Sequence, residues 1–226
     1  MGGLGTKGEV KMYEYVEESV IKPYRRYCSN IMIELRDSLN ENYDIITQFS
    51  LVGSGSDSRN MVTANGNGPF DLDYNLQIIR MPDKYWNNLM KLKDTVRNEL
   101  NKIVHNTFFS DGKDSKSVIT SLLHFNDEPN VEFSFDIAIL ARNNNGNWCR
   151  LIHNKSFQNQ FTWNEVPTSH NVKDKAQALK SKHLWNEVRD RYLDLKNKYL
   201  RNNDNNHPSF IVYVEAVNQI YQRYFR

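Results

Sequence analysis

The sequence predicts an α+β fold, in which a sheet region flanked by helices is followed by a C-terminal helical region. The first observation is a set of short apolar or alternating segments between residues 45 and 152, which is typical of strands. The second is a change near Pro167, after which apolar residues recur at helical spacing. We therefore expect an α/β core with its N-terminal helix at residues 1–165 and a helical region at residues 166–226.

The first region is expected to begin with a helix. Apolar residues recur at helical spacing over residues 24–39, and Pro23 is expected to start this helix or to kink it. A second helix, opened by Pro82, has its apolar residues on one side over residues 86–103. Five strands are predicted, at residues 45–52, 70–79, 117–125, 131–140 and 148–152. The strands 117–125 and 131–140 are expected to form a hairpin.

The C-terminal region is predicted to contain only helices and loops. Apolar residues over 172–199 follow one long amphipathic helix. Residues 201–207 form a polar loop, and Pro208 then lies in the first turn of a last helix.

Composition places the chain among globular proteins, with 39% hydrophobic and 25% charged residues. The 29 basic and 27 acidic residues leave a net charge of +2, so no global charge points to nucleic acid as the partner. Cys28 and Cys149 lack metal-ligand spacing, and we expect reduced, buried thiols. No run approaches 18 apolar residues and no signal segment opens the chain, so we expect a soluble cytoplasmic protein without a membrane partner.

Asp71 and Asp73 carry the most functional information. They lie two positions apart on the predicted strand 70–79, so both carboxylates project from one face, with their Cα atoms roughly 7 Å apart. Like charges held together repel each other unless a cation lies between them. Mg²⁺ suits such a pair, because it binds one or two carboxylates together with phosphate oxygens of a substrate.

A glycine-serine turn precedes this pair. Gly53, Ser54, Gly55 and Ser56 follow the strand 45–52, and such a turn can offer backbone N–H groups and hydroxyls to a phosphate. Taken alone, an Asp-x-Asp pair usually marks a solvated strand face, and a Gly-Ser repeat usually marks a loop or linker. Their order and spacing, with an apolar strand before each, favour the joint functional interpretation.

Asp136 is the candidate third carboxylate. Residues 131–140 alternate between apolar and polar positions, and Asp136 lies in the middle of the polar set. Aspartate has a poor strand propensity and resists burial without a partner. A solvated sheet face is the alternative, but the Asp71/Asp73 pair already requires a third ligand.

These residues resemble the pattern of the nucleotidyltransferase superfamily, which has the DNA polymerase β-like fold. That pattern begins with an apolar residue followed by Gly and then by Gly or Ser, which are Gly53 and Ser54 in this sequence. After a spacer it continues with Asp-x-Asp or Asp-x-Glu, and it ends with a third Asp later in the chain. The resemblance covers roughly residues 45–142. The spacer before Asp71 is long, and the doubled Gly-Ser leaves open whether Ser54 or Ser56 contacts phosphate.

The resemblance implies a mixed sheet and a nucleotidyl-transfer reaction. Asp71, Asp73 and Asp136 would hold Mg²⁺ or Mn²⁺, and the turn Gly53–Ser56 would hold the β- and γ-phosphates of a nucleoside triphosphate such as ATP. A nucleoside monophosphate would pass to an acceptor hydroxyl while pyrophosphate leaves. The acceptor is open among an RNA end, a second nucleotide, a small molecule and a protein. The flanking helices look most like the RNA- and nucleotide-acceptor branches.

Two other interpretations are open. The same fold can serve as a non-catalytic module that binds nucleotide or RNA, or as the partner of a toxin protein. Loss of a catalytic carboxylate would mark such a module, and all three are present in this sequence. An unrelated α/β domain with coincidental acidic strands is the third possibility.

Overall fold

The computed structural model describes residues 12–66, 68–124, 132–156, 160–167, 170–204 and 206–225. The chain divides into two compact units. The larger unit comprises Val16–Val62 and Gly68–Thr168. The smaller unit comprises Met1–Tyr15, Thr63–Asn67 and Ser169–Arg226.

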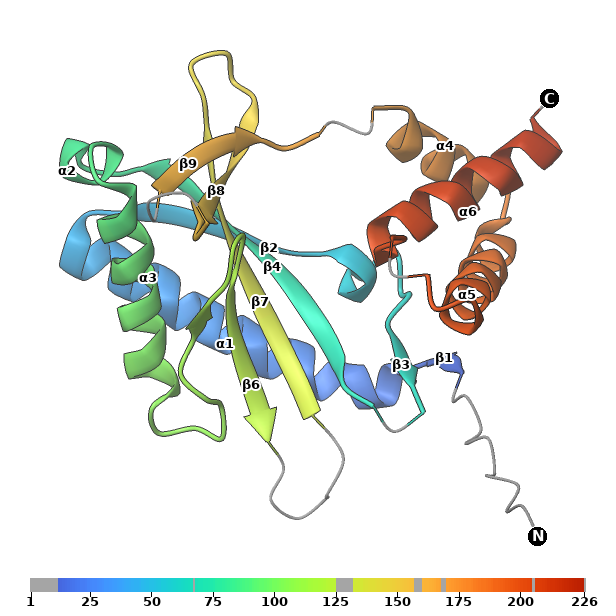
Figure 1. The fold of residues 1–226 in the computed structure, drawn as a ribbon, viewed down its shortest axis with the longest axis horizontal. Helices are drawn as coiled ribbons and strands as arrows, with labels where there is room; N and C mark the ends of the chain where they lie inside the picture. Colours follow the sequence, from blue (N-terminus) through green and yellow to red (C-terminus); the bar gives the residue numbers. More distant parts are fainter. Residues whose placement is uncertain are drawn as a thin grey trace, which may run out of the picture. The chain divides into compact units, whose positions relative to one another are not determined.

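A mixed sheet forms the centre of the larger unit (Figure 1). Its strands are β2 (Ile46–Val52), β4 (Phe70–Arg80), β5 (Lys113–Asp114), β6 (Ile119–His124), β7 (Glu132–Arg142), β8 (Trp148–Asn154) and β9 (Gln160–Glu165). The strand order is β2-β4-β7-β6-β5, and β8 pairs with both β7 and β9. β4 and β7 are parallel, whereas the other pairs are antiparallel. The predicted α+β class with a mixed sheet is confirmed.

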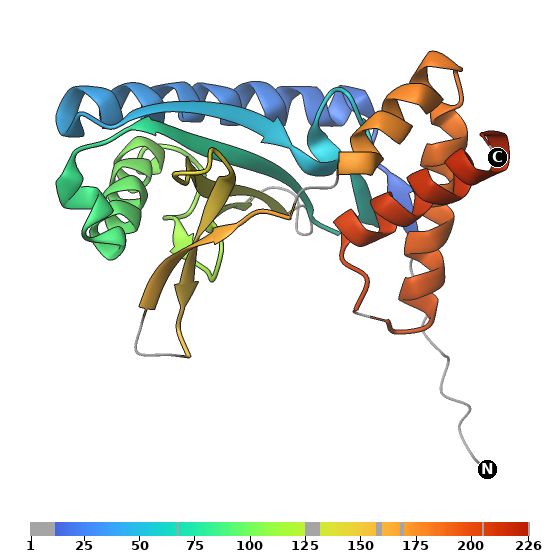
Figure 2. The same cartoon turned by 90° about the horizontal axis from the view of Figure 1, so that it is seen from above.

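Three helices belong to the larger unit: α1 (Glu18–Tyr43), α2 (Asp83–Trp86) and α3 (Leu89–Val104). Figure 2 shows α1, in blue, lying along the sheet. Alternate residues of β4 are buried, and one of them, Tyr74, reaches Ser29 of α1 at 3.3 Å between the hydroxyl oxygens. The rings of Tyr24 on α1 and Phe133 on β7 lie 4.7 Å apart between centroids. The core therefore lies between α1 and one face of β4 and β7, which leaves the polar residues of these strands on the other face.

Helix boundaries differ from the sequence-based expectations in two places in this unit. Pro23 lies inside α1, which begins five residues earlier at Glu18, so it does not start the helix. The helix expected from Pro82 onward is two helices, because Asn88 begins α3 by accepting the N–H of Lys91 at 2.9 Å. β6 and β7 pair as the predicted hairpin, and its turn at residues 126–130 lies outside the described residues. Cys28 and Cys149 are free and buried, as expected.

The smaller unit combines β1 (Tyr13–Tyr15) and β3 (Thr63–Asn65) with α4 (His170–Ser181), α5 (Trp185–Arg201) and α6 (Ser209–Tyr224). The side-chain amide of Asn197 on α5 accepts the backbone N–H of Tyr13 on β1 at 2.7 Å and donates to the carbonyl of Tyr13 at 3.0 Å. The single helix expected over 172–199 is wrong, because His183, with φ of 58°, separates α4 from α5. The domain division at residue 166 stays a prediction. No helix in the described part of the chain is long and apolar enough to cross a membrane.

Candidate metal and nucleotide site

The sheet brings the three predicted carboxylates together. In the parallel ladder between β4 and β7, Asp73 is the Cα partner of Asp136, and Asp71 precedes Asp73 by two residues. One carboxylate oxygen from each of the three lies within 4.8 Å of the other two. Asp71 is exposed, while Asp73 and Asp136 are partly buried. The alternation of each strand places the acids on the face opposite the core, and the register then aligns them.

The electrostatics of this cluster favour a bound cation. Burial, and then the charges of Asp71 and Asp136, raise the pKa of Asp73 to about 7. Burial and the charge of Asp71 also raise the pKa of Asp136, against a hydrogen bond from Thr120. The Oδ1 atom of Asp136 is buried and has no hydrogen-bond partner among the described residues. Three converging carboxylates, one of them with an orphaned oxygen, are a donor set that fits Mg²⁺ or Mn²⁺.

The glycine-serine turn lies against the same cluster. Gly53–Gly55 forms one 3₁₀ turn directly after β2, and Gly53 has a φ of +67°. A Cβ atom on Gly53 would lie 2.6 Å from Oδ2 of Asp73, and one on Gly55 would lie 2.4 Å from a methyl of Leu72. Only glycine allows the main chain to take this conformation and to approach the carboxylate so closely. The turn is therefore fitted to the acidic strand.

The two serines of the turn are in different environments. The hydroxyl of Ser56 donates to the carbonyl of Gly53 at 3.1 Å and so closes the turn. No hydrogen bond of the Ser54 hydroxyl is found among the described residues, whereas its carbonyl accepts the N–H of Met61 at 2.9 Å. The side chain of Ser54 is thus available to a ligand, while that of Ser56 already has a structural role.

Two arginines near the site were missed by sequence reasoning. Arg25 of α1 donates through Nε to the carbonyl of Gly55 at 2.9 Å and also binds Asp57, which follows the turn, at 3.1 Å. The positive charges of Arg150 on β8 and of Arg59 lower the pKa of Asp73, but burial and the neighbouring carboxylates raise it more strongly. The Nε atom of Arg150 is buried without a hydrogen-bond partner among the described residues. In the sequence neither arginine differs from an ordinary surface residue.

Comparison with known proteins identifies the fold. No family model and no curated protein matches the sequence. Solved structures match over most of the chain. A structure of the Vibrio cholerae di-nucleotide cyclase DncV with ATP and GTP is 10% identical, has a TM-score of 0.59, and aligns 93% of this chain with 70% of that chain. The cyclic dinucleotide synthase CdnE of Elizabethkingia meningoseptica, with GTP and Apcpp, is 14% identical, with a TM-score of 0.50 and coverages of 93% and 78%.

CdnC of E. coli MS115-1, solved with ATP, is 15% identical, has a TM-score of 0.51, and aligns 94% of this chain with only 63% of that chain. The chain thus spans less than two thirds of this relative's length. The matched structures are of the CD-NTase type, which belongs to the DNA polymerase β-like superfamily. This chain therefore has the nucleotidyltransferase fold.

Proposed function

We propose that the protein is a metal-dependent nucleotidyltransferase that moves a nucleoside monophosphate from a nucleoside triphosphate to an acceptor hydroxyl, with release of pyrophosphate. The observation that carries the proposal is the convergence of Asp71, Asp73 and Asp136 within 4.8 Å, with the turn of Gly53 beside them. The solved structures with this fold include a cyclic dinucleotide synthase and a di-nucleotide cyclase, solved with GTP or with ATP and GTP, which supports the same class of reaction.

Asp71, Asp73 and Asp136 would hold Mg²⁺ or Mn²⁺ in this protein. A divalent cation held there supplies charge neutralisation for the triphosphate and lowers the pKa of an acceptor hydroxyl. Asp136 accepts the proton of that hydroxyl in our proposal, because its buried Oδ1 is orphaned and its pKa is raised. The hydroxyl oxygen then bonds to the α-phosphorus while the bond to the pyrophosphate oxygen breaks.

The turn binds the leaving group. The N–H groups of Gly53–Ser56 and the hydroxyl of Ser54 donate to the β- and γ-phosphates, since Ser56 is engaged in closing the turn. Arg25 holds the turn in place through the carbonyl of Gly55. Arg150 adds positive charge next to Asp73, where the triphosphate would lie. Positioning and charge neutralisation, rather than covalent catalysis, supply the rate.

The acceptor is proposed to be a second nucleotide, so that the product is a linear or cyclic dinucleotide. This choice rests on the matched structures described as a di-nucleotide cyclase and as a cyclic dinucleotide synthase. An RNA end, a small molecule and a protein are the other acceptors.

The test is incubation with each α-labelled nucleoside triphosphate, singly and in pairs, with Mg²⁺ or Mn²⁺. Products are separated by chromatography and identified by mass. A labelled dinucleotide formed by the parent and by Asp111→Asn, an exposed loop aspartate, but not by Asp73→Asn supports the proposal. Metal-dependent binding of the triphosphate without any turnover would favour the non-catalytic binding module.

A further inference from the structure

Two adjoining cavities lie at the end of the larger sheet that is remote from the aspartates. The smaller, of about 190 Å³, is lined by Ile78, Ile79, Trp86, Arg142 and Trp148. The larger, of about 350 Å³, also contains Trp86 and Arg142 and extends to Trp163. Three of the four tryptophans of the chain therefore line this tryptophan pocket.

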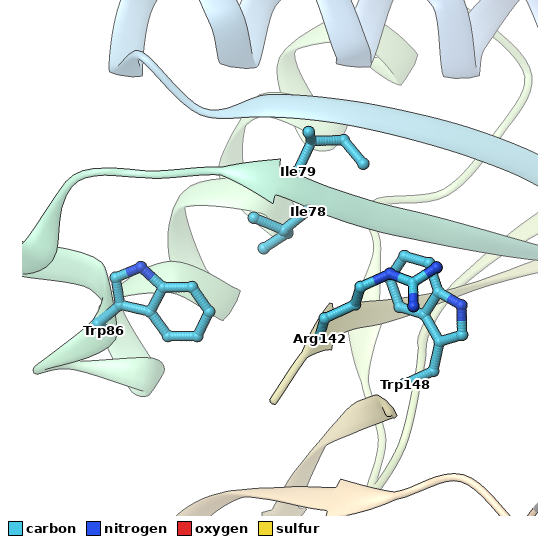
Figure 3. A pocket seen from close by; sticks show the side chains of 5 residues that line it. All are labelled: Ile78, Ile79, Trp86, Arg142 and Trp148. Carbon is cyan, nitrogen blue, oxygen red and sulfur yellow. The ribbon is translucent and has the colours of Figure 1, made fainter. Parts of the chain in front are cut away.

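Planar side chains line the tryptophan pocket on two sides. Figure 3 shows Trp86 on one side and Arg142 with Trp148 on the other, with Ile78 and Ile79 on β4 between them. The guanidinium of Arg142 lies 4.4 Å from the ring centroid of Trp148. Trp86 is 42% exposed, so its ring is accessible to a ligand.

Local contacts hold these walls in place. Arg142 donates to the carbonyl of Gly146 at 2.7 Å, which ties the guanidinium to the turn between β7 and β8. Tyr85, next to Trp86 on the short helix α2, is buried and anchors that helix. The rings of Trp86 and Trp163 lie 6.1 Å apart between centroids. The pocket is therefore formed before any ligand binds.

We propose that the tryptophan pocket binds a nucleobase. Bases stack on tryptophan rings and on guanidinium planes, and each base carries ring-nitrogen or carbonyl acceptors at its edge. An aliphatic chain would not use the planar surfaces that Trp86 and the stacked Arg142 and Trp148 offer. The base can come from a free nucleoside or nucleotide, or from a single-stranded oligonucleotide.

This site is separate from the acidic cluster. Ile78 follows Asp73 by five residues on β4, which is about 17 Å along an extended strand. The inference therefore does not rest on the proposed function. A nucleoside, which lacks phosphate, should bind in the pocket without metal.

The test uses the full chain with Trp185→Phe, because Trp185 is the one tryptophan outside the pocket. Adenosine, guanosine, cytidine, uridine and a tetra-adenylate are titrated in EDTA, with tryptophan fluorescence excited at a wavelength beyond base absorption. Ligand-observed NMR gives the affinity independently of the fluorophores. Trp86→Ala removes one wall, and Phe108→Ala, 76% exposed elsewhere on the same unit, is the control.

We expect saturable quenching that Phe108→Ala retains and a loss of affinity of roughly 5- to 100-fold in Trp86→Ala. Arg142→Gln should weaken binding in the same direction. Binding of nucleosides identifies a free nucleoside or nucleotide as the source of the base, whereas binding of the tetra-adenylate alone identifies an oligonucleotide. Absence of binding by all five compounds, or equal affinity in Trp86→Ala and the control, overturns the proposal.

Discussion

Replacing Asp73 by asparagine should stabilise the metal-free protein while it abolishes nucleotidyl transfer. The reason is the pKa of this carboxyl, which burial and the charges of Asp71 and Asp136 raise from 3.8 to about 7 in the folded protein. The folded state therefore keeps a proton that the unfolded state releases between pH 3.8 and 7. As a result, the ionised form destabilises the fold increasingly over that interval.

The magnitude follows from the size of the shift. A rise of about three pKa units corresponds to about 4 kcal/mol at pH 7 or above, which is the ceiling for this effect. Asparagine is still a buried polar group, so the substitution removes the charge repulsion but only part of the cost of burial, and the expected gain is smaller than this ceiling. We expect a gain of about 2 kcal/mol in the free energy of unfolding, or roughly 4–8 °C in melting temperature.

The assay is thermal and chemical unfolding of the parent and of Asp73→Asn in EDTA, from pH 4.5 to pH 8. The stability advantage of the variant should be smallest at pH 4.5, grow with pH, and level off above pH 7. Adding Mg²⁺ with a nucleoside triphosphate should then reverse the order. Binding at 100 times Kd stabilises the parent by about 2.7 kcal/mol, whereas the neutral amide is a weak ligand for a hard cation.

Two results would contradict the raised pKa of Asp73 as the source of this stability difference. If the variant unfolds more easily than the metal-free parent at pH 7.5, Asp73 has a structural role that outweighs the repulsion. If the difference between the two proteins is independent of pH, the carboxyl is not held in a protonated state by its surroundings.

Three further outcomes follow from the same structure. Gly53→Ala should lower the free energy of unfolding, measured by urea denaturation, more than Gly146→Ala does. Both glycines have a positive φ, which costs about 1–3 kcal/mol for alanine, but only at Gly53 does the added Cβ also meet Asp73. Arg25→Gln should raise the KM for the nucleoside triphosphate several-fold with a smaller change in kcat, because the proposed phosphate-binding turn loses its hydrogen bond from α1. Equal KM values would contradict this role. Asp114→Asn should destabilise the protein by about 3 kcal/mol in the same denaturation assay, because the buried Lys93 loses its carboxylate partner. A change below about 0.5 kcal/mol would contradict a stabilising role for this ion pair.

Sequence reasoning predicted the acidic cluster because strand periodicity is a local property. Alternation over 131–140 placed Asp136 on the polar face of its strand, and the two-residue spacing of Asp71 and Asp73 placed both on one face. The register that pairs Asp73 with Asp136 depends on the crossover through α2 and α3, which the pattern does not encode. The resemblance to nucleotidyltransferases indicated that a third Asp joins the pair, but it did not give this register.

The helix breaks and the second pocket could not be predicted in the same way. Apolar spacing continues across Asn88 and His183. The periodicity therefore does not reveal the cap with which Asn88 begins α3 or the positive φ of His183 between α4 and α5. Arg142, Trp86 and Trp163 come from three separate elements, and only the folded sheet and α2 bring them together. Contacts between elements far apart in sequence, such as that of Arg25 with the glycine turn, are likewise determined by packing.

The most direct test of the central claim is the rate of pyrophosphate release from paired nucleoside triphosphates with Mg²⁺, compared between the parent and Asp136→Asn. We expect metal-dependent release by the parent, loss of at least a hundredfold in the variant, and no release by either protein in EDTA. Release at the parent rate by Asp136→Asn, or in the absence of a divalent cation, would contradict a metal site built from the three aspartates.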